Sequence, residues 1–269
     1  MIKNEINVSI IMQSYLGDYP ESRKNPKSKF IRAVYSVILQ TIENWELIIV
    51  SDGCTITEQI YNTYFKHYKD IRLIKIPKSD ETLMNSNGNY KRGLPKQKGV
   101  ENAKGDWIMY LDSDDYILKN SIFKLCNMIK KISDFPKKES SLDIRYIINN
   151  SLVYNYKKYD NISNGEKPEG SIIKQKRGEP FKINGLPDMW ISLKDVIKGS
   201  SKDVVSASTA NIIHKRGYPK WEWCDTNSQN KFEDFEYISR IATENEIKHV
   251  MYISFPFYVK CFEKNNYDF

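Results

Sequence analysis

Short, mainly apolar runs of residues alternate with amphipathic segments through the first half of the chain. Strands are predicted at residues 8–12, 45–50, 71–76 and 108–111, and the runs at 8–12 and 45–50 are typical of buried strands of a parallel sheet. Helices are predicted between them at residues 30–40, 57–68 and 121–132. A further helix is expected to end near residue 103, where Gly105 is a C-cap signal. Strands that alternate with helices predict a parallel sheet with right-handed crossovers.

The second half of the chain is less regular. Strands are predicted at residues 143–156, 206–214 and 250–259. A helix is predicted at residues 233–241, because Phe235, Ile238 and Ile241 share one face. Two polar, basic stretches are predicted to be loops, and they are residues 17–29, with Pro20 and Pro26, and residues 161–184.

Polar clusters follow three of the predicted strands at the point where each strand ends. They are Gln13-Ser14-Tyr15, Ser51-Asp52-Gly53 and Asp112-Ser113-Asp114. Ligands of parallel sheets bind at the carboxyl ends of the strands, so we expect the three clusters to meet at one edge. The alternative for the acidic stretch that ends at Asp115 is a solvated turn that caps the next helix.

Asp112 and Asp114 flank a single residue, so both carboxylates are available to one small site at the mouth of the strand. Oxygen ligands favour a hard cation such as Mg²⁺ or Mn²⁺, which typically bridges to phosphate.

The composition narrows the class of protein. With 40% hydrophobic and 28% charged residues, the chain suits a soluble globular protein, and its 269 residues suit one large α/β domain or one domain with a substantial appendage. It has no run of about 18 apolar residues, so no transmembrane segment is expected. The four cysteines form no Cys-x-x-Cys pair, which argues against zinc and disulfide frameworks and predicts a reducing, cytoplasmic setting.

The net charge of +7 favours anionic partners such as nucleotide sugars, nucleic acid or anionic membrane. Lysine far outnumbers arginine, whereas surfaces that read phosphate usually recruit arginine.

In their order along the chain, these motifs resemble the family 2 glycosyltransferases of the GT-A fold. Residues 8–15 are similar to the opening strand of that family, with Gln13 in place of the usual proline. Residues 46–53 are similar to the strand that ends in Asp-Asp-Gly, with Ser51 in place of the first Asp. The other similar segments are residues 36–41, residues 99–115 leading into the DxD motif, residues 212–217, and residues 233–240 with the Glu-Asp helix.

The resemblance implies an α/β fold of the GT-A type, with a Rossmann-like, mostly parallel sheet flanked by helices and a smaller acceptor-side region. Residues 1–120 would form the nucleotide-sugar-binding half. Residues 121–269 would form the acceptor-binding half, with the base helix and the final strand, in one continuous domain. The implied reaction is an inverting, metal-dependent transfer of a sugar from a nucleoside diphosphate, commonly UDP, to an acceptor hydroxyl.

The resemblance also implies roles for single residues. Asp52 would hydrogen-bond the base of the donor, and Gln13, Ser14 and Tyr15 would line the nucleoside pocket. Arg92 and Lys96 would lie near the nucleotide. Asp112 would contact the ribose and the sugar, Ser113 would also bind the donor, and Asp114 would bind the Mn²⁺ or Mg²⁺ ion.

On the acceptor side, Asp234 would act as the general base, and Glu233 would orient it or bind the acceptor. The alternative for this pair is an acidic helix N-terminus that favours the helix dipole. His214, Trp221 and Trp223 are weaker acceptor-side candidates, for which packing in the core is the alternative. The last residues of the chain lack the histidine that some relatives carry there.

The acceptor is either a glycan precursor or a hydroxymethylated base of phage-type DNA. The net charge and the basic stretches at residues 17–29 and 164–182 favour DNA slightly. A rival hypothesis is a nucleotide-binding module without catalysis, in which Asp234 is structural. A dinucleotide oxidoreductase is not indicated, because no Gly-x-Gly-x-x-Gly follows the first strand.

Overall fold

The computed structural model describes residues 7–17, 25–78, 93–133, 143–154, 172–174, 209–220 and 250–261, together with Trp223, Tyr237 and Ile241. The strands are β1 (Val8–Ser14), β2 (Trp45–Asp52), β3 (Ile71–Ile76), β4 (Trp107–Tyr110), β5 (Tyr116–Ile117), β6 (Tyr146–Tyr154), β7 (Ile172–Lys174), β8 (Ile212–Lys215) and β9 (Val250–Cys261). The helices are α1 (Pro26–Ile38), α2 (Thr55–Ile60), α3 (Gly93–Glu101) and α4 (Ser121–Ser133). A π-helical segment (Tyr61–Phe65) follows α2, and a 3-10 turn (Thr209–Asn211) precedes β8.

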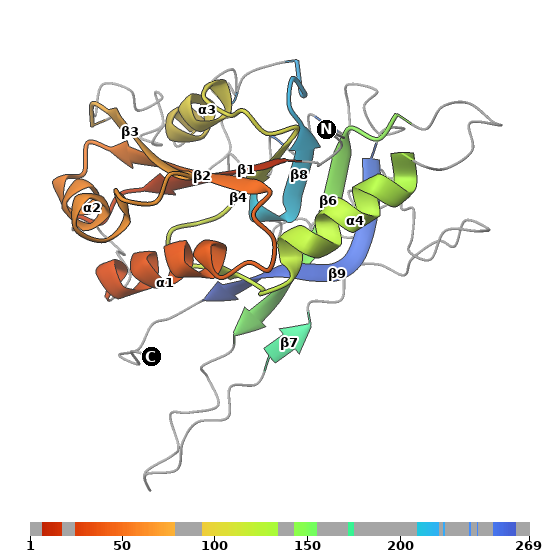
Figure 1. The fold of residues 1–269 in the computed structure, drawn as a ribbon, viewed down its shortest axis with the longest axis horizontal. Coiled ribbons are helices and arrows are strands. Elements are labelled where there is room, and N and C mark those ends of the chain that lie inside the picture. Colours follow the sequence, from red (N-terminus) through yellow and green to blue (C-terminus); the bar gives the residue numbers. More distant parts are fainter. Residues whose placement is uncertain are drawn as a thin grey trace, which may run out of the picture.

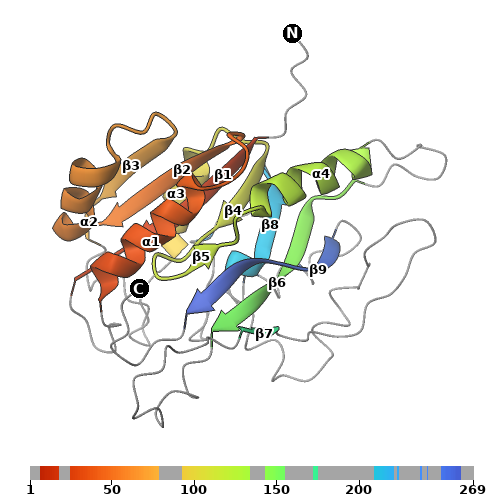
Figure 2. The same ribbon diagram turned by 60° about the horizontal axis from the view of Figure 1, so that its bottom comes forward.

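The described strands form one mixed sheet of nine strands, in the order β3-β2-β1-β4-β8-β6-β9-β5, with β7 paired to β6 (Figure 1). The four strands from β3 to β4 are parallel, as the alternation of strands and helices predicts. β8 is antiparallel to both β4 and β6, whereas β9 is parallel to β6. Figure 2 shows the long strand β9 running beside β6, and its pairing with β5 completes the sheet.

Both faces of the sheet are covered at β1 and β2, which explains why these two strands are mainly apolar and almost wholly buried. Ile10 and Met12 of β1 pack with the apolar faces of α1 and α4, and the intervening Ile11 packs on the opposite face with side chains of α3. Figure 1 shows the same layers, with α3 on one side of the sheet and α1 and α4 on the other.

The predicted end signals of two helices are wrong. Pro26 was expected in a loop, but it begins α1, because the first turn of a helix does not need the missing N–H of proline. Gly105 does not cap α3, which ends at Glu101, and its φ is not positive. Instead the N–H of Gly105 donates to Ser9 Oγ at 2.8 Å, and a Cβ atom there would lie 2.6 Å from the Ser9 nitrogen. The glycine is required by this close approach.

Within the strand predicted at residues 206–214, Thr209–Asn211 form a 3-10 turn, and strand β8 begins only at Ile212. Asn211 in that turn donates from Nδ2 to the Asn149 carbonyl at 2.9 Å and accepts a 3.1 Å bond from the Tyr258 hydroxyl. These bonds hold a buried polar side chain where strand geometry was expected. The short strands β5 and β7 were not predicted, and β7 lies within the stretch predicted as a loop.

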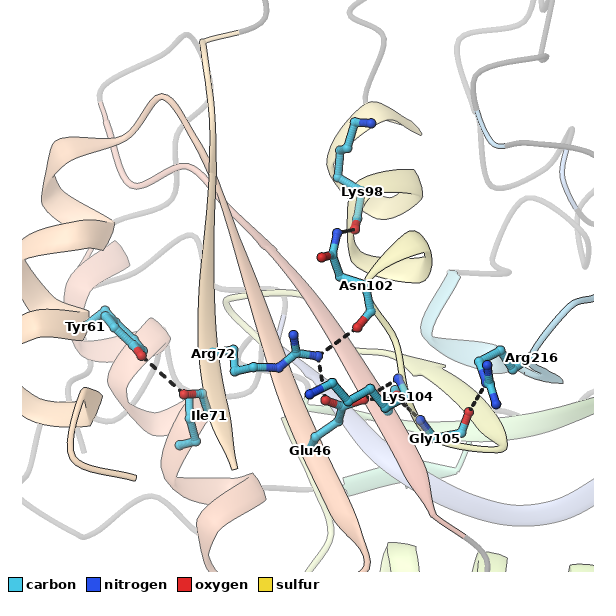
Figure 3. A network of polar contacts seen from close by, with 10 residues as sticks. Glu46, Tyr61, Ile71, Arg72, Lys98, Asn102, Lys104, Gly105 and Arg216 are labelled. Atoms are coloured by element: carbon cyan, nitrogen blue, oxygen red, sulfur yellow. Dashed lines mark hydrogen bonds and ion pairs between the residues drawn. The ribbon is translucent and has the colours of Figure 1, made fainter. Parts of the chain in front are cut away.

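A polar network ties the amino-terminal ends of β1, β2 and β3 to the segment that follows α3 (Figure 3). Glu46 Oε1 accepts from Ser9 Oγ and from the Lys104 N–H, each at 2.6 Å, and Glu46 Oε2 accepts from Arg72 at 2.6 Å. Arg72 also donates to the Asn102 carbonyl at 2.7 Å. Burial acts to raise the pKa of Glu46, but these hydrogen bonds lower it overall.

The network borders a pocket of about 260 Å³, which is lined by Asn7, Val8, Trp45, Glu46, Lys69, Asp70, Arg72, Lys104 and Gly105. This pocket lies at the amino-terminal ends of the strands, opposite the edge where the polar clusters are expected. Within the described part of the chain, no helix is long and apolar enough to cross a membrane.

Candidate active site at the carboxyl edge of the sheet

The carboxyl ends of β2, β1 and β4 lie side by side, in this order across the sheet. Ser14 at the end of β1 pairs with Ser51 of β2, and Ile11 pairs with Tyr110 of β4. The Leu111 N–H then donates to the Ile11 carbonyl at 3.0 Å, so the chain leaves β4 at the same edge. The structure therefore brings the three polar clusters together at one end of the parallel strands, where α/β proteins bind their ligands.

At the end of β1, the three predicted nucleoside-pocket residues differ in exposure. Ser14 is buried, and its hydroxyl is 2.9 Å from the Thr57 hydroxyl of α2. Gln13 and Tyr15 are half-buried, and the Lys78 ammonium lies 5.3 Å from the centroid of the Tyr15 ring. Ser14 therefore fixes α2 against β1, while Gln13 and Tyr15 are the members of this cluster that retain accessible surface.

The turn after β2 explains the serine that replaces the first Asp of the family motif. Ser51 Oγ accepts the Cys54 N–H at 3.2 Å and donates to the Cys54 carbonyl at 3.1 Å. Gly53 has a φ of 60°, which favours glycine, and its N–H donates to the Ile76 carbonyl at 3.0 Å. Asp52, the last residue of β2, is held by this turn and is only 8% exposed.

The acidic turn after β4 is held through its backbone. The Asp115 N–H donates to the Asp112 carbonyl at 3.1 Å, and Arg32 of α1 donates to the Asp114 carbonyl at 2.7 Å. Neither bond uses the carboxylate of Asp112 or Asp114, and both residues are half-buried. Asp115 is buried, so it is distinct from the two carboxylates at the mouth of the strand.

The alternative that this turn caps the next helix is wrong. Strand β5 follows the turn, and α4 begins only at Ser121. The Ser121 hydroxyl instead donates to the Phe257 carbonyl of β9 at 2.6 Å. The acidic residues are therefore separated from α4 by a strand.

The carboxylate oxygens at this edge suit a divalent cation whose coordination is completed by a bound substrate. Among the described residues, no group of three or more His, Cys, Asp or Glu side chains is placed to hold a metal ion. Mg²⁺ is commonly bound through one or two carboxylates, with the remaining positions taken by substrate phosphate and water. Asp112 and Asp114 are such a pair of carboxylates.

Lys96 lies in the first turn of α3, on the face of the sheet that carries Tyr110. It is only 3% exposed, and its ammonium is 4.8 Å from the centroid of the Trp223 ring. Trp223 in turn stacks on Tyr237, with ring centroids 3.5 Å apart and an interplanar angle of 3°. The predicted donor-side lysine and the predicted acceptor-side tryptophan are thus in contact.

His214 of β8 is buried next to Tyr110. Its Nε2 is 2.8 Å from the Tyr110 hydroxyl, and its Nδ1 is 3.0 Å from the Lys215 carbonyl. Burial lowers the pKa of His214 to about 4, so the imidazole is neutral at neutral pH.

Four predicted site residues lie outside the described part of the chain, and they are Arg92, Trp221, Glu233 and Asp234. Conversely, the sequence did not single out Tyr110 or Tyr237. Tyr110 is part of an apolar run, two residues before Asp112, and Tyr237 follows Asp234 by three residues. Their places beside the motifs were the available signal, but each has the sequence context of an ordinary core residue.

The family model described as glycosyl transferase family 2 matches residues 24–190. The chain belongs to this family. In Bacillus spizizenii, a poly(ribitol-phosphate) beta-glucosyltransferase is 33% identical over 99 residues, which is 36% of this chain and 14% of that protein. An uncharacterized glycosyltransferase of Methanocaldococcus jannaschii is 27% identical over 234 residues, which is 85% of this chain and 68% of that protein.

Among solved structures, S. aureus TarS 1-349 in complex with UDP-GlcNAc superposes with a TM-score of 0.59 at 16% identity. The match covers 97% of this family 2 chain and 60% of the TarS chain. The likeness confirms the predicted GT-A fold class. The chain thus spans only a small part of the Bacillus protein and about three fifths of the TarS chain.

Proposed function

We propose that this family 2 chain is a glycosyltransferase that moves a sugar from a UDP-sugar to an acceptor hydroxyl, with inversion at the sugar. The observation that carries the proposal is the convergence of Asp52, Asp112 and Asp114 at the carboxyl edge of β1, β2 and β4. The structure of TarS with UDP-GlcNAc, a member of the same fold class, supports the choice of donor.

On the donor side, Asp52 binds the uracil through its carboxylate, and Gln13 and Tyr15 lie along the nucleoside. Their places at the ends of β2 and β1 support these roles, because the nucleotide of such a sheet binds at strand ends. Lys96 supplies positive charge near the diphosphate from the first turn of α3, together with Arg92.

Asp112 and Asp114 hold the Mg²⁺ or Mn²⁺ ion, and Asp112 also contacts the ribose and the sugar. When bound, such an ion offsets the negative charge that develops on the departing UDP. The hydrogen bond from Arg32 to the Asp114 carbonyl supports this role, because it holds the backbone of the acidic turn without using the carboxylate.

On the acceptor side, Asp234 removes the proton of the acceptor hydroxyl as that oxygen attacks the anomeric carbon. The attack forms the new glycosidic bond on the face opposite the departing UDP, which inverts the anomeric centre. Glu233 orients Asp234 or binds the acceptor. These two roles rest on the family resemblance of residues 233–240.

We propose a polyanionic glycan precursor as the first acceptor class, because the Bacillus relative is a poly(ribitol-phosphate) transferase and this chain carries a net charge of +7. Hydroxymethylated duplex DNA is the second, since the same charge suits it. A cytoplasmic location remains part of the proposal, and Cys54 and Cys126 are free thiols that suit a reducing compartment.

The test is a screen of UDP-sugars, with and without Mn²⁺, that measures released UDP. Poly(ribitol phosphate) and hydroxymethylated duplex DNA serve as acceptors. Release that needs both Mn²⁺ and an acceptor supports the proposal, and the acceptor that stimulates it identifies the class. Binding of UDP without turnover on any acceptor would instead favour the nucleotide-binding module without catalysis.

A further inference from the structure

The hydroxyl of Tyr110 uses its full hydrogen-bonding capacity inside the protein. His214 Nδ1 faces a carbonyl at 3.0 Å and so carries the proton, which makes His214 Nε2 an acceptor. The Tyr110 hydroxyl therefore donates to His214 Nε2 at 2.8 Å. Its oxygen accepts from Trp223 Nε1 at 2.9 Å and is also hydrogen-bonded to Tyr237.

The partners of Tyr110 come from parts of the chain that are far apart in sequence. Tyr110 belongs to β4 and precedes Asp112 by two residues, whereas Trp223 is 113 residues later. Tyr237 has helical backbone and follows the predicted base Asp234 by three residues. One hydroxyl thus joins the strand that leads into the acidic turn to two aromatic residues of the acceptor-binding half.

Trp223 is also held by α3, which carries the predicted donor-side residue Lys96. The Trp223 N–H donates to Gln97 Oε1 at 3.1 Å, and a Cβ atom on Gly93 would lie 2.8 Å from the Trp223 carbonyl oxygen. The Lys96 ammonium covers the Trp223 ring. Trp223 is therefore fixed by its backbone, its indole N–H and its ring face, and the indole N–H bond is the contact that uses the Tyr110 hydroxyl.

We propose that Tyr110 is a positioning residue, whose hydroxyl sets the place of Trp223 and Tyr237 relative to the acidic turn after β4. This inference rests on the proposed function, because the acceptor must reach the donor sugar at the end of β4. A phenylalanine would fill the same volume, so the hydroxyl is distinguished from simple packing by its three directional bonds. Its loss is expected to disturb transfer and leave the donor pocket intact.

The test compares Tyr110→Phe with Tyr258→Phe in the full chain. Tyr258 of β9 is the matched control, because it is also a buried tyrosine, and its hydroxyl donates to Asn211 Oδ1 at 3.1 Å. It packs in the hydrophobic core on the face of the sheet that α1 and α4 cover, away from Trp223. We expect both variants to lose melting temperature, and Tyr110→Phe to lose more, because three buried groups lose a hydrogen-bond partner there. Turnover is expected to fall about 10- to 100-fold in Tyr110→Phe alone, as for a displaced reacting group, with the KM for UDP-sugar within about twofold of wild type.

A second measurement follows the ¹H–¹⁵N resonance of the Trp223 indole, identified by its absence in Trp223→Phe. It is expected to shift in Tyr110→Phe and to stay in place in Tyr258→Phe. Equal turnover losses in the two variants, or a loss in Tyr110→Phe that lies wholly in the KM for donor, would overturn the proposal. If the wild-type protein transfers no sugar, the proposed function fails, and an unshifted indole resonance in Tyr110→Phe then overturns the positioning of Trp223.

Discussion

Asp114 shows how the backbone of a residue can be fixed by hydrogen bonds that do not use its carboxylate. Arg32 binds its carbonyl at 2.7 Å, and the neighbouring N–H of Asp115 closes the turn. The carboxylate takes no part in either bond. The sequence predicted the acidic cluster, but it gave no sign of Arg32, which lies 82 residues earlier.

Replacing this carboxylate tests the metal assignment. In Asp114→Ala, the Mn²⁺-dependent part of UDP binding is expected to disappear, because the ion loses a charged ligand. Calorimetric titration of UDP with and without Mn²⁺ measures this part directly. Asp70→Ala at the opposite edge of the sheet is the control and should bind UDP normally. Unchanged Mn²⁺ dependence in Asp114→Ala would remove Asp114 from the metal site.

His214 gives a prediction for stability against pH. Its folded pKa is lowered to about 4 by burial, whereas an unfolded histidine has a pKa of 6.5. Between these values the unfolded chain binds the proton and the folded chain does not, so stability falls as pH decreases from about 6.5. The part due to His214 is expected to be about 2 kcal/mol between pH 7 and pH 5.

Urea unfolding at these two pH values, in the wild-type protein and in His214→Gln, measures that part. Glutamine offers a neutral acceptor for the Tyr110 hydroxyl but has no titratable group. The decrease on acidification should therefore be smaller in the variant. An equal decrease in both proteins would mean that other groups cause the whole effect.

At the scale of elements, the sequence predicted the strands that are buried on both faces better than the points where helices begin and end. The runs of β1 and β2 needed only a local apolar pattern. The requirement for glycine at position 105 comes from its contact with Ser9, which is 96 residues away in the sequence, so a local sequence pattern cannot predict it. Likewise, β5 is two residues long and exists through its pairing with β9.

Glu46 shows how one side chain can join several elements. Glu46→Ala leaves the Ser9 hydroxyl, the Lys104 N–H and Arg72 without their shared acceptor, so we expect a loss of about 1–3 kcal/mol in the free energy of unfolding. Glu58→Ala is the control, because it removes a more exposed pair with Lys75 that is worth about 0–1 kcal/mol.

Urea unfolding of both variants checks this difference, and calorimetry of UDP checks the donor edge. UDP affinity should be unchanged in Glu46→Ala, because the network lies at the opposite ends of the strands (Figure 3). A loss of stability no larger than that of Glu58→Ala would show that the network does not hold the strands together.

At the scale of the whole molecule, topology explains why part of the candidate site could be predicted. Parallel strands place their carboxyl ends at one edge, so the order of motifs along the chain was enough to bring Asp52 and Asp112 to the same edge. No comparable topological rule predicts the contact between Lys96 and Trp223. It depends on how Trp223, from the second half of the chain, is placed against α3, which the sequence pattern does not encode locally.

The last prediction concerns the separate roles proposed for the two halves of the chain. If the first half binds the donor and the second supplies the base, Asp234→Asn should lose transfer while it keeps UDP affinity. Asparagine has nearly the same shape but cannot take the acceptor proton, and loss of a general base costs about 10²- to 10⁴-fold in rate. Turnover with saturating acceptor and calorimetry of UDP with Mn²⁺ measure the two properties separately.

The competing role for Asp234 is to cap its helix, and it predicts a different result. Asparagine caps a helix about as well as aspartate, so Asp234→Asn would then be nearly silent in turnover. The turnover rates that the two roles predict for Asp234→Asn differ by about two orders of magnitude or more, so a single rate measurement distinguishes them. Glu233→Gln is the companion variant, because near-normal turnover in Asp234→Asn with a large loss in Glu233→Gln would move the base by one residue. A loss of UDP affinity in Asp234→Asn would instead contradict the separation of the two halves.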